Sequence, residues 1–142
     1  MSNINKKQLA LFIIVPILLG AIIGLITVPN SNIDSILPSW IFPVVWTILY
    51  TLMGVSSYLI YRDRGVIPRI YLIQLFFNYT WVFIFFTFKL YLLAFIWIII
   101  LIILVVLMIK EFLSINKTAG YLQIPYLIWL LVATILNLTF II

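Results

Sequence analysis

Residues 91–109 read YLLAFIWIIILIILVVLMI, and this stretch decides the fold. It contains no charged residue, no glycine and no proline. As a helix, which rises about 1.5 Å per residue, it is long enough to cross the hydrocarbon core of a bilayer, which is about 30 Å thick. The stretch therefore predicts a transmembrane helix.

Four further apolar runs of similar length accompany this stretch. Their approximate bounds are residues 9–28, 43–61, 68–88 and 119–140. They are too long for the strands of a membrane barrel, which need only about ten residues. The sequence therefore predicts an all-α membrane protein, a bundle of five transmembrane helices that forms a single domain over residues 1–142.

The composition excludes several kinds of chemistry. Hydrophobic residues make up 67% of the chain and charged residues only 8%, which is typical of a protein that faces lipid. Cysteine and histidine are absent, so thiolate nucleophiles, zinc sites and the usual haem ligands are excluded. The acidic residues Asp34, Asp63 and Glu111 all lie between the apolar runs. We expect no catalytic residue, no metal site and no required cofactor.

The basic residues predict an orientation. Lys89 is alone on one side of the predicted bundle, and the other seven Lys and Arg residues lie at the N-terminus and in the second and fourth connections. By the positive-inside rule, the N-terminus is cytoplasmic and the C-terminus outside, in a bacterial cell membrane. Cations dispersed in this way favour membrane lipid over nucleic acid as a partner.

Polar and small residues mark one face of the second, third and fifth spans, because they recur at steps of three or four. They are Pro43, Trp46, Thr47, Tyr50, Gly54, Ser57 and Tyr61 in the second span, Gln74, Asn78, Trp81 and Phe85 in the third, and Tyr126, Trp129, Ala133 and Asn137 in the fifth. Unpaired amides in hydrocarbon cost several kcal/mol, so we expect the three faces to look at one another. Small Gly54 and Ala133 among large rings would leave a slot for a planar molecule.

Helix packing alone is an alternative explanation for these residues. Asn and Gln side chains join transmembrane helices without a ligand, at roughly 0.6 to 2 kcal/mol per hydrogen bond. The fourth span is almost wholly apolar and is expected to face lipid. In the first span, Gly20 and Gly24 form a small-xxx-small pattern that permits close helix packing, and packing within the chain is favoured over dimerisation.

Three blocks of sequence carry a family resemblance. They are WIFPVVWTILY at residues 40–50 with Met53-Gly54, QLFFNYTW at residues 74–81, and PYLIW at residues 125–129 with Leu136-Asn137. In their order, and in the number of helices, they resemble the tryptophan-rich sensory protein and translocator protein family (TspO/MBR, also called the peripheral benzodiazepine receptor family). The resemblance covers the chain from about Pro38 to Asn137.

The resemblance implies a pocket among the helices, open toward the first connection, that binds porphyrins, other tetrapyrroles and benzodiazepine-like small molecules. The family's pocket positions correspond to Trp46, Asn78, Trp81, Tyr126, Trp129, Ala133 and Asn137, to which the polar face of the second span adds Tyr50. The resemblance also implies a homodimer. The first connection is shorter than is usual for the family, so any lid over the pocket is expected to be smaller.

Three functions are therefore open. The leading hypothesis is an integral membrane binding protein, a sensor or carrier, that holds protoporphyrin or a similar flat apolar ligand by stacking and shape. The second is light-dependent degradation of protoporphyrin, in which Trp46 and Trp129 would be the matching tryptophans. The third is a structural or transport subunit of the membrane whose aromatic faces serve only helix packing.

Overall fold

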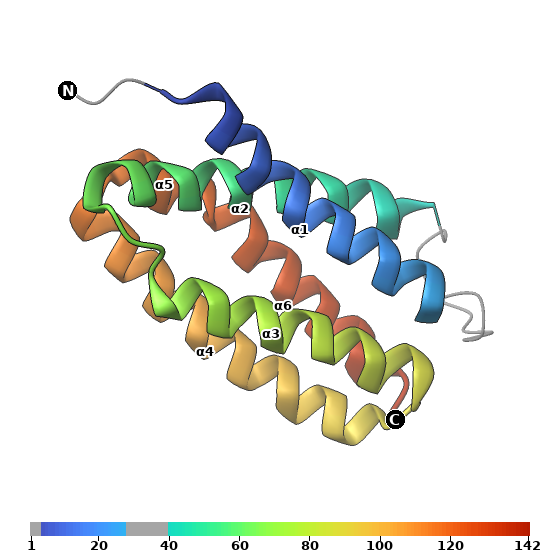
Figure 1. Cartoon of the computed structure of the whole chain (residues 1–142). Coiled ribbons are helices and arrows are strands. Elements are labelled where there is room, and N and C mark those ends of the chain that lie inside the picture. The colour runs from blue at the N-terminus through green and yellow to red at the C-terminus, as the bar shows by residue number, and fades with distance from the viewer. Residues whose placement is uncertain (1–3, 28–39) are drawn as a thin grey trace.

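The computed structural model describes residues 4–27 and 40–142, and in them the chain is a helical bundle (Figure 1). The elements are α1 (Lys6–Thr27), α2 (Ile41–Arg64), α3 (Arg69–Val82), the π-helical turn η2 (Phe83–Thr87), α4 (Tyr91–Ile115), α5 (Lys117–Leu122) and α6 (Ile124–Thr139). With η2 continuing α3, and α6 continuing α5, five helices of the described part are long and apolar enough to cross a membrane. The predicted all-α bundle of five spans is confirmed.

The helices alternate in direction. In Figure 1, α1, α3 and α6 run one way, whereas α2 and α4 run the opposite way. The N-terminus and the α2–α3 and α4–α5 connections therefore lie at one end of the bundle, here called the N-terminal end. The α3–α4 connection and the C-terminus lie at the other end, here called the C-terminal end.

The fourth helix differs from its prediction. One stripe of α4 is buried and packs against α3, α5 and α6, so this helix does not face only lipid. Its buried residues are Ala94, Ile98, Leu101, Val105, Met108, Ile109 and Phe112. This stripe cannot be recognised in the sequence, because lipid tails and a protein core are equally apolar. The most exposed span is α1, in which only Pro16 and Thr27 are buried and which packs mainly on α2.

The fifth span was predicted to be one continuous helix, but the structure divides it into two. It is interrupted at Gln123, between α5 and α6, and Pro125 stands in the first turn of α6. Proline has no backbone N–H, so it cannot continue the hydrogen bonding of a preceding helix. The Asn116 side chain begins α5 by accepting a hydrogen bond from the backbone N–H of Ala119 at 3.2 Å.

Glycines set how closely the first two helices approach. A Cβ atom at Gly54 would lie 2.4 Å from the carbonyl oxygen of Phe12, so the α1 backbone rests directly on Gly54. The expectation that Gly54 lines a slot is therefore wrong, because α1 fills that space. A Cβ atom at Gly20 would lie 2.5 Å from the ring of Tyr50, whereas one at Gly24 would meet no atom of the described residues within 4 Å. Among the described residues, Gly20 is therefore the member of the small-residue pair that serves packing within the chain.

Candidate functional site

Four side chains from three helices form one hydrogen-bonded chain inside the bundle. The Tyr50 hydroxyl donates to Asn78 Oδ1 at 2.7 Å, and Asn78 Nδ2 donates to the Tyr126 hydroxyl at 2.8 Å. Tyr126 in turn donates to Gln74 Oε1 at 2.8 Å. These four residues, here called the central polar chain, are each at most 5% exposed. The polar faces of the second, third and fifth spans thus meet, as the periodicity predicted.

Helical spacing explains how the central polar chain is assembled. Gln74 and Asn78 are four residues apart on α3, so both point to the same side of that helix. They meet Tyr50 of α2 and Tyr126 of α6, which lie on either side. Each phenol and amide in the chain bonds to another, so none bears the free-energy cost of an unpaired polar group away from water. The chain is therefore a rigid, neutral floor that holds three helices together.

An aromatic rim, formed by Phe42, Trp46 and Trp129, adjoins this floor. Trp46 stacks on Tyr50 with ring centroids 5.5 Å apart, and its edge meets Tyr126 at 6.4 Å. The rings of Trp46 and Trp129 are perpendicular, with centroids 6.5 Å apart, and Phe42 meets Trp129 at 6.2 Å. Trp46 and Trp129 are only half-buried, whereas the tyrosines beneath them are buried.

The indole nitrogen of Trp129 has an unused hydrogen-bonding capacity. Its Nε1 atom is buried and has no hydrogen-bond partner among residues 4–27 and 40–142. Indole N–H groups in protein interiors normally find a partner. The rim therefore holds a free donor next to two rings that can stack.

The remaining predicted residues form a separate group toward the C-terminal end. Trp81 Nε1 donates to Asn137 Oδ1 at 3.1 Å, and Asn137 Nδ2 donates to the Tyr91 carbonyl at 2.9 Å. Phe85 stacks on Trp81 at 5.0 Å. Within residues 4–27 and 40–142, no hydrogen bond or ring contact links Trp81 or Asn137 to the rim. These two residues join α3, α6 and the start of α4.

The eight predicted site residues thus divide among three places. Tyr50, Asn78 and Tyr126 belong to the central polar chain, and Trp46 and Trp129 to the rim. Ala133 is buried in the core, four residues from both Trp129 and Asn137 on α6. Trp81 and Asn137 form the separate pair.

Sequence reasoning left two buried amides out of the predicted set. Gln74 ends the central polar chain, and its spacing of four from Asn78 was the signal for it. Gln123 is completely buried, yet neither atom of its amide has a hydrogen-bond partner in the part of the chain that the structure describes. Its signal was its position three residues before Tyr126, on the same side of the fifth span.

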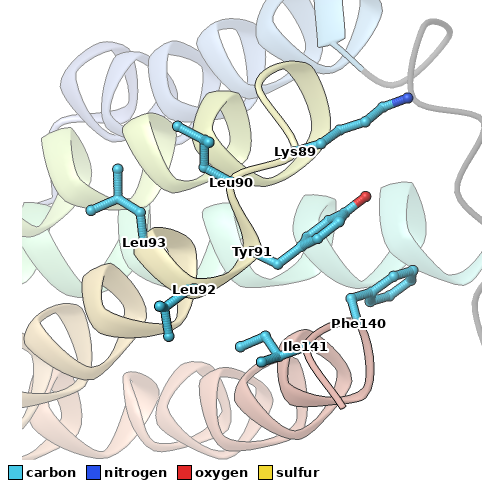
Figure 2. A pocket seen from close by; sticks show the side chains of 7 residues that line it. All are labelled: Lys89, Leu90, Tyr91, Leu92, Leu93, Phe140 and Ile141. Carbon is cyan, nitrogen blue, oxygen red and sulfur yellow. The ribbon is translucent and has the colours of Figure 1, made fainter.

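An open hollow of about 390 Å³ lies at the C-terminal end (Figure 2). It is lined by Lys89, Leu90, Tyr91, Leu92, Leu93, Phe140 and Ile141, none of which belongs to the predicted set. In Figure 2 the amine of Lys89 and the hydroxyl of Tyr91 extend to the same side. Lys89 has a left-handed backbone with φ 54°, which is uncommon for a residue other than glycine.

The chemistry available at the rim and the central polar chain is neutral. The two acids in the described ranges lie at the N-terminal end, where Asp63 pairs with Arg62 at 3.1 Å and Glu111 pairs with Arg64 at 3.3 Å. The part of the chain that the structure describes holds no cluster of acids able to bind a metal. Phenols, amides and indoles remain, and they bind by stacking, shape and neutral hydrogen bonds. The first connection, with its predicted small lid, lies outside the described residues.

Comparison with known proteins agrees with these features. The TspO/MBR family pattern matches residues 12–142. The chain is 34% identical over 102 residues to a tryptophan-rich sensory protein of Cereibacter sphaeroides, which covers 70% of this chain and 65% of that relative. It is 31% identical over 107 residues to the translocator protein of Homo sapiens, which covers 70% of this chain and 63% of that protein. The matches thus span less than two thirds of the length of these two relatives. The chain belongs to the TspO/MBR family, the family that its three sequence blocks resemble.

Proposed function

We propose that this membrane protein binds porphyrins and similar flat apolar molecules at the aromatic rim, and acts as a sensor or carrier. The observation that carries the proposal is the pair of half-buried, perpendicular rings of Trp46 and Trp129, 6.5 Å apart, above a buried neutral floor. A flat ligand can stack on one ring and meet the edge of the other. The printed names of the relatives, sensory protein and translocator protein, fit a sensor or a carrier.

The free indole N–H of Trp129 gives such a ligand an orienting contact. It can donate to a nitrogen or oxygen acceptor on the ligand, and so gain a partner that it lacks among the described residues. The sequence contains no histidine or cysteine, so a metal-free porphyrin suits the rim better than one that needs iron ligation by these residues. Protoporphyrin is the proposed ligand, and benzodiazepine-like molecules are expected to compete with it.

Quenching of tryptophan fluorescence by protoporphyrin, in detergent and in the dark, tests the proposal. We expect saturable quenching that is weakened by Trp46→Phe and by Trp129→Phe. Each aromatic contact contributes about 0.5 to 1.5 kcal/mol, so each loss should raise the Kd by roughly twofold to tenfold.

Trp97→Phe is the matched control. The Trp97 ring stacks on Phe77 at 4.6 Å, and its N–H donates to the Phe77 carbonyl at 3.0 Å, so the protein already uses both its ring and its donor. This variant should keep the affinity of the natural chain. Linear quenching that ignores all three substitutions would mean that porphyrin merely partitions into the micelle, and helix packing would then explain the aromatic residues.

Light-dependent degradation of protoporphyrin is the second candidate. The closeness of the Trp46 and Trp129 rings favours it, because two redox-active indoles would adjoin one bound pigment. Absorbance of the complex, followed in light and in darkness with and without oxygen, separates the two functions. Protoporphyrin itself bleaches in light with oxygen, so the free pigment is the reference. A pure binder does not speed this bleaching, whereas degradation by the protein consumes the bound pigment faster than the free pigment, and only in light with oxygen.

We also propose that the protein lies in a bacterial cell membrane with a cytoplasmic N-terminus, because seven of its eight cations lie at the N-terminal end. The natural chain has no cysteine, so single-cysteine variants report on topology cleanly. In intact cells, a thiol reagent that cannot cross membranes should label Ile142→Cys but not Asn5→Cys. The reverse pattern would contradict the proposed orientation.

A further inference from the structure

A second layer of buried polar groups lies one helical turn from the central polar chain. Tyr71 precedes Gln74 by three residues on α3, and Gln123 precedes Tyr126 by three residues at the start of α6. Both helices run in the same direction (Figure 1), and the Tyr126 hydroxyl bonds to Gln74 Oε1 at 2.8 Å. Tyr71 and Gln123 therefore occupy the same level of the bundle, nearer the N-terminal end. We call them the Tyr71–Gln123 layer.

The polar atoms of this layer are poorly paired among the described residues. Gln123 is completely buried and Tyr71 is 4% exposed. Neither the nitrogen nor the oxygen of the Gln123 amide makes a hydrogen bond within residues 4–27 and 40–142, and the Tyr71 hydroxyl has the buried Ser57 hydroxyl nearby but makes no well-formed hydrogen bond. Unpaired groups of this kind cost several kcal/mol in an apolar medium, so buried polar groups in proteins are nearly always satisfied. The layer therefore needs a small partner that can both donate and accept.

The break between α5 and α6 adjoins the layer. Pro125 has no N–H and so cannot bond to the Tyr121 carbonyl, but the backbone N–H of Gln123 bonds to the carbonyls of Gly120 and Tyr121. The freed carbonyl therefore keeps a donor, and the unpaired groups at this level are those of the side chains. The break lies near the N-terminal end of the bundle, where Lys117 and Tyr121, which precede it, are exposed.

We propose that the Tyr71–Gln123 layer is an internal water-binding site that extends the central polar chain toward the N-terminal end. Water both donates and accepts, as the amide and the phenol require, whereas an ion would find no charged side chain in the layer. Through this water, the floor beneath the rim exchanges protons with the solvent at the N-terminal end. The proposal is independent of which ligand the rim binds.

Hydroxyl-radical footprinting with X-ray pulses tests the proposal on the natural chain in detergent. Radicals form from water in place, so a buried side chain that touches bound water is modified, and one that touches only protein is not. Tyr58 is the matched control, because it is 1% exposed and its hydroxyl accepts a hydrogen bond from the Asn5 backbone N–H at 2.7 Å. We expect Tyr71 to be modified severalfold faster than Tyr58.

Substitution of Gln123 adds a second measurement. Gln123→Leu should lower the Tyr71 rate to that of Tyr58, while Gln123→Glu, which keeps a polar side chain, should keep Tyr71 labelled. Far-UV circular dichroism confirms that each variant is folded. Equal rates at Tyr71 and Tyr58 in the natural chain would overturn the proposal without any variant. A fast Tyr71 that ignores Gln123→Leu in the folded protein would also overturn it, because the water would then not be held by this layer.

Discussion

The central polar chain and the Tyr71–Gln123 layer contain the same kinds of residue, but they differ in their hydrogen bonding. Each pairs a tyrosine and a glutamine from α3 and the fifth span, and the two levels are one helical turn apart. In the central chain the phenol of Tyr126 both accepts and donates at 2.8 Å. In the layer, neither the phenol nor the amide makes a well-formed hydrogen bond with the described residues. The difference arises from Asn78 and Tyr50, which complete the hydrogen bonding of the central polar chain.

This comparison teaches that one level is a fixed scaffold and the other a place for solvent. A fully satisfied network of buried polar groups holds its members in one geometry. A ligand at the rim therefore meets a floor that does not need to rearrange. The Tyr71–Gln123 layer is also polar but has no such network, and it lies nearer the N-terminal end of the bundle.

Asn78→Leu should have the largest effect on stability, because Asn78 joins Tyr50 to Tyr126 in the central polar chain. The change removes the acceptor of the Tyr50 hydroxyl and the donor to the Tyr126 hydroxyl in one step. Orphaned groups cost roughly 1 to 3 kcal/mol each, so we expect a loss of about 2 to 4 kcal/mol in the free energy of unfolding. Titration with sodium dodecyl sulfate, followed by circular dichroism, measures it. A loss below about 0.5 kcal/mol would show that the chain contributes little to stability.

Replacing a tyrosine by phenylalanine in each of the two places compares how much their hydroxyls contribute to stability. Tyr126→Phe leaves an amide donor and an amide acceptor without their shared hydroxyl, and should cost about 1 to 3 kcal/mol. Tyr71→Phe removes a hydroxyl that makes no well-formed hydrogen bond with the described residues and would bond to the proposed water, which can bond elsewhere, so stability should change by less than about 0.5 kcal/mol. Both variants are measured in the same unfolding titration. Equal losses would mean that the two hydroxyls are satisfied to the same degree.

Sequence periodicity predicted much of this arrangement. Steps of three and four placed Tyr50, Asn78 and Tyr126 on facing sides of three helices, because an amide in hydrocarbon must find a partner. Periodicity did not show that Trp81 and Asn137 would satisfy each other apart from the rim. It also missed the break at Gln123, which depends on the missing N–H of Pro125.

The apolar helices were predicted less well, for a related reason. In a membrane, lipid and protein core offer an apolar side chain the same solvent, so hydrophobicity alone does not reveal a buried stripe. For that reason the buried face of α4 could not be read from an almost uniform run of leucine and isoleucine. The sequence also did not show that α1 would be the most exposed span, because that depends on how the helices pack against one another.

Lys89→Gln should change ligand affinity rather than stability, and it tests the neutrality of the interior. The central polar chain offers no cation to a carboxylate, so the propionates of a bound protoporphyrin would have to meet a charge at the C-terminal end. Lys89 is the only Lys or Arg of the sequence on that side. A charge near the membrane surface contributes about 1 kcal/mol, so the variant should bind protoporphyrin about fivefold more weakly.

The dimethyl ester of protoporphyrin has the same flat ring without the charges, and its affinity should not change. Lys110→Gln, at the opposite end, is the control for net charge and should leave both affinities as they are. If Lys89→Gln weakened the ester as much as the acid, Lys89 would act through the fold of its left-handed turn rather than through its charge.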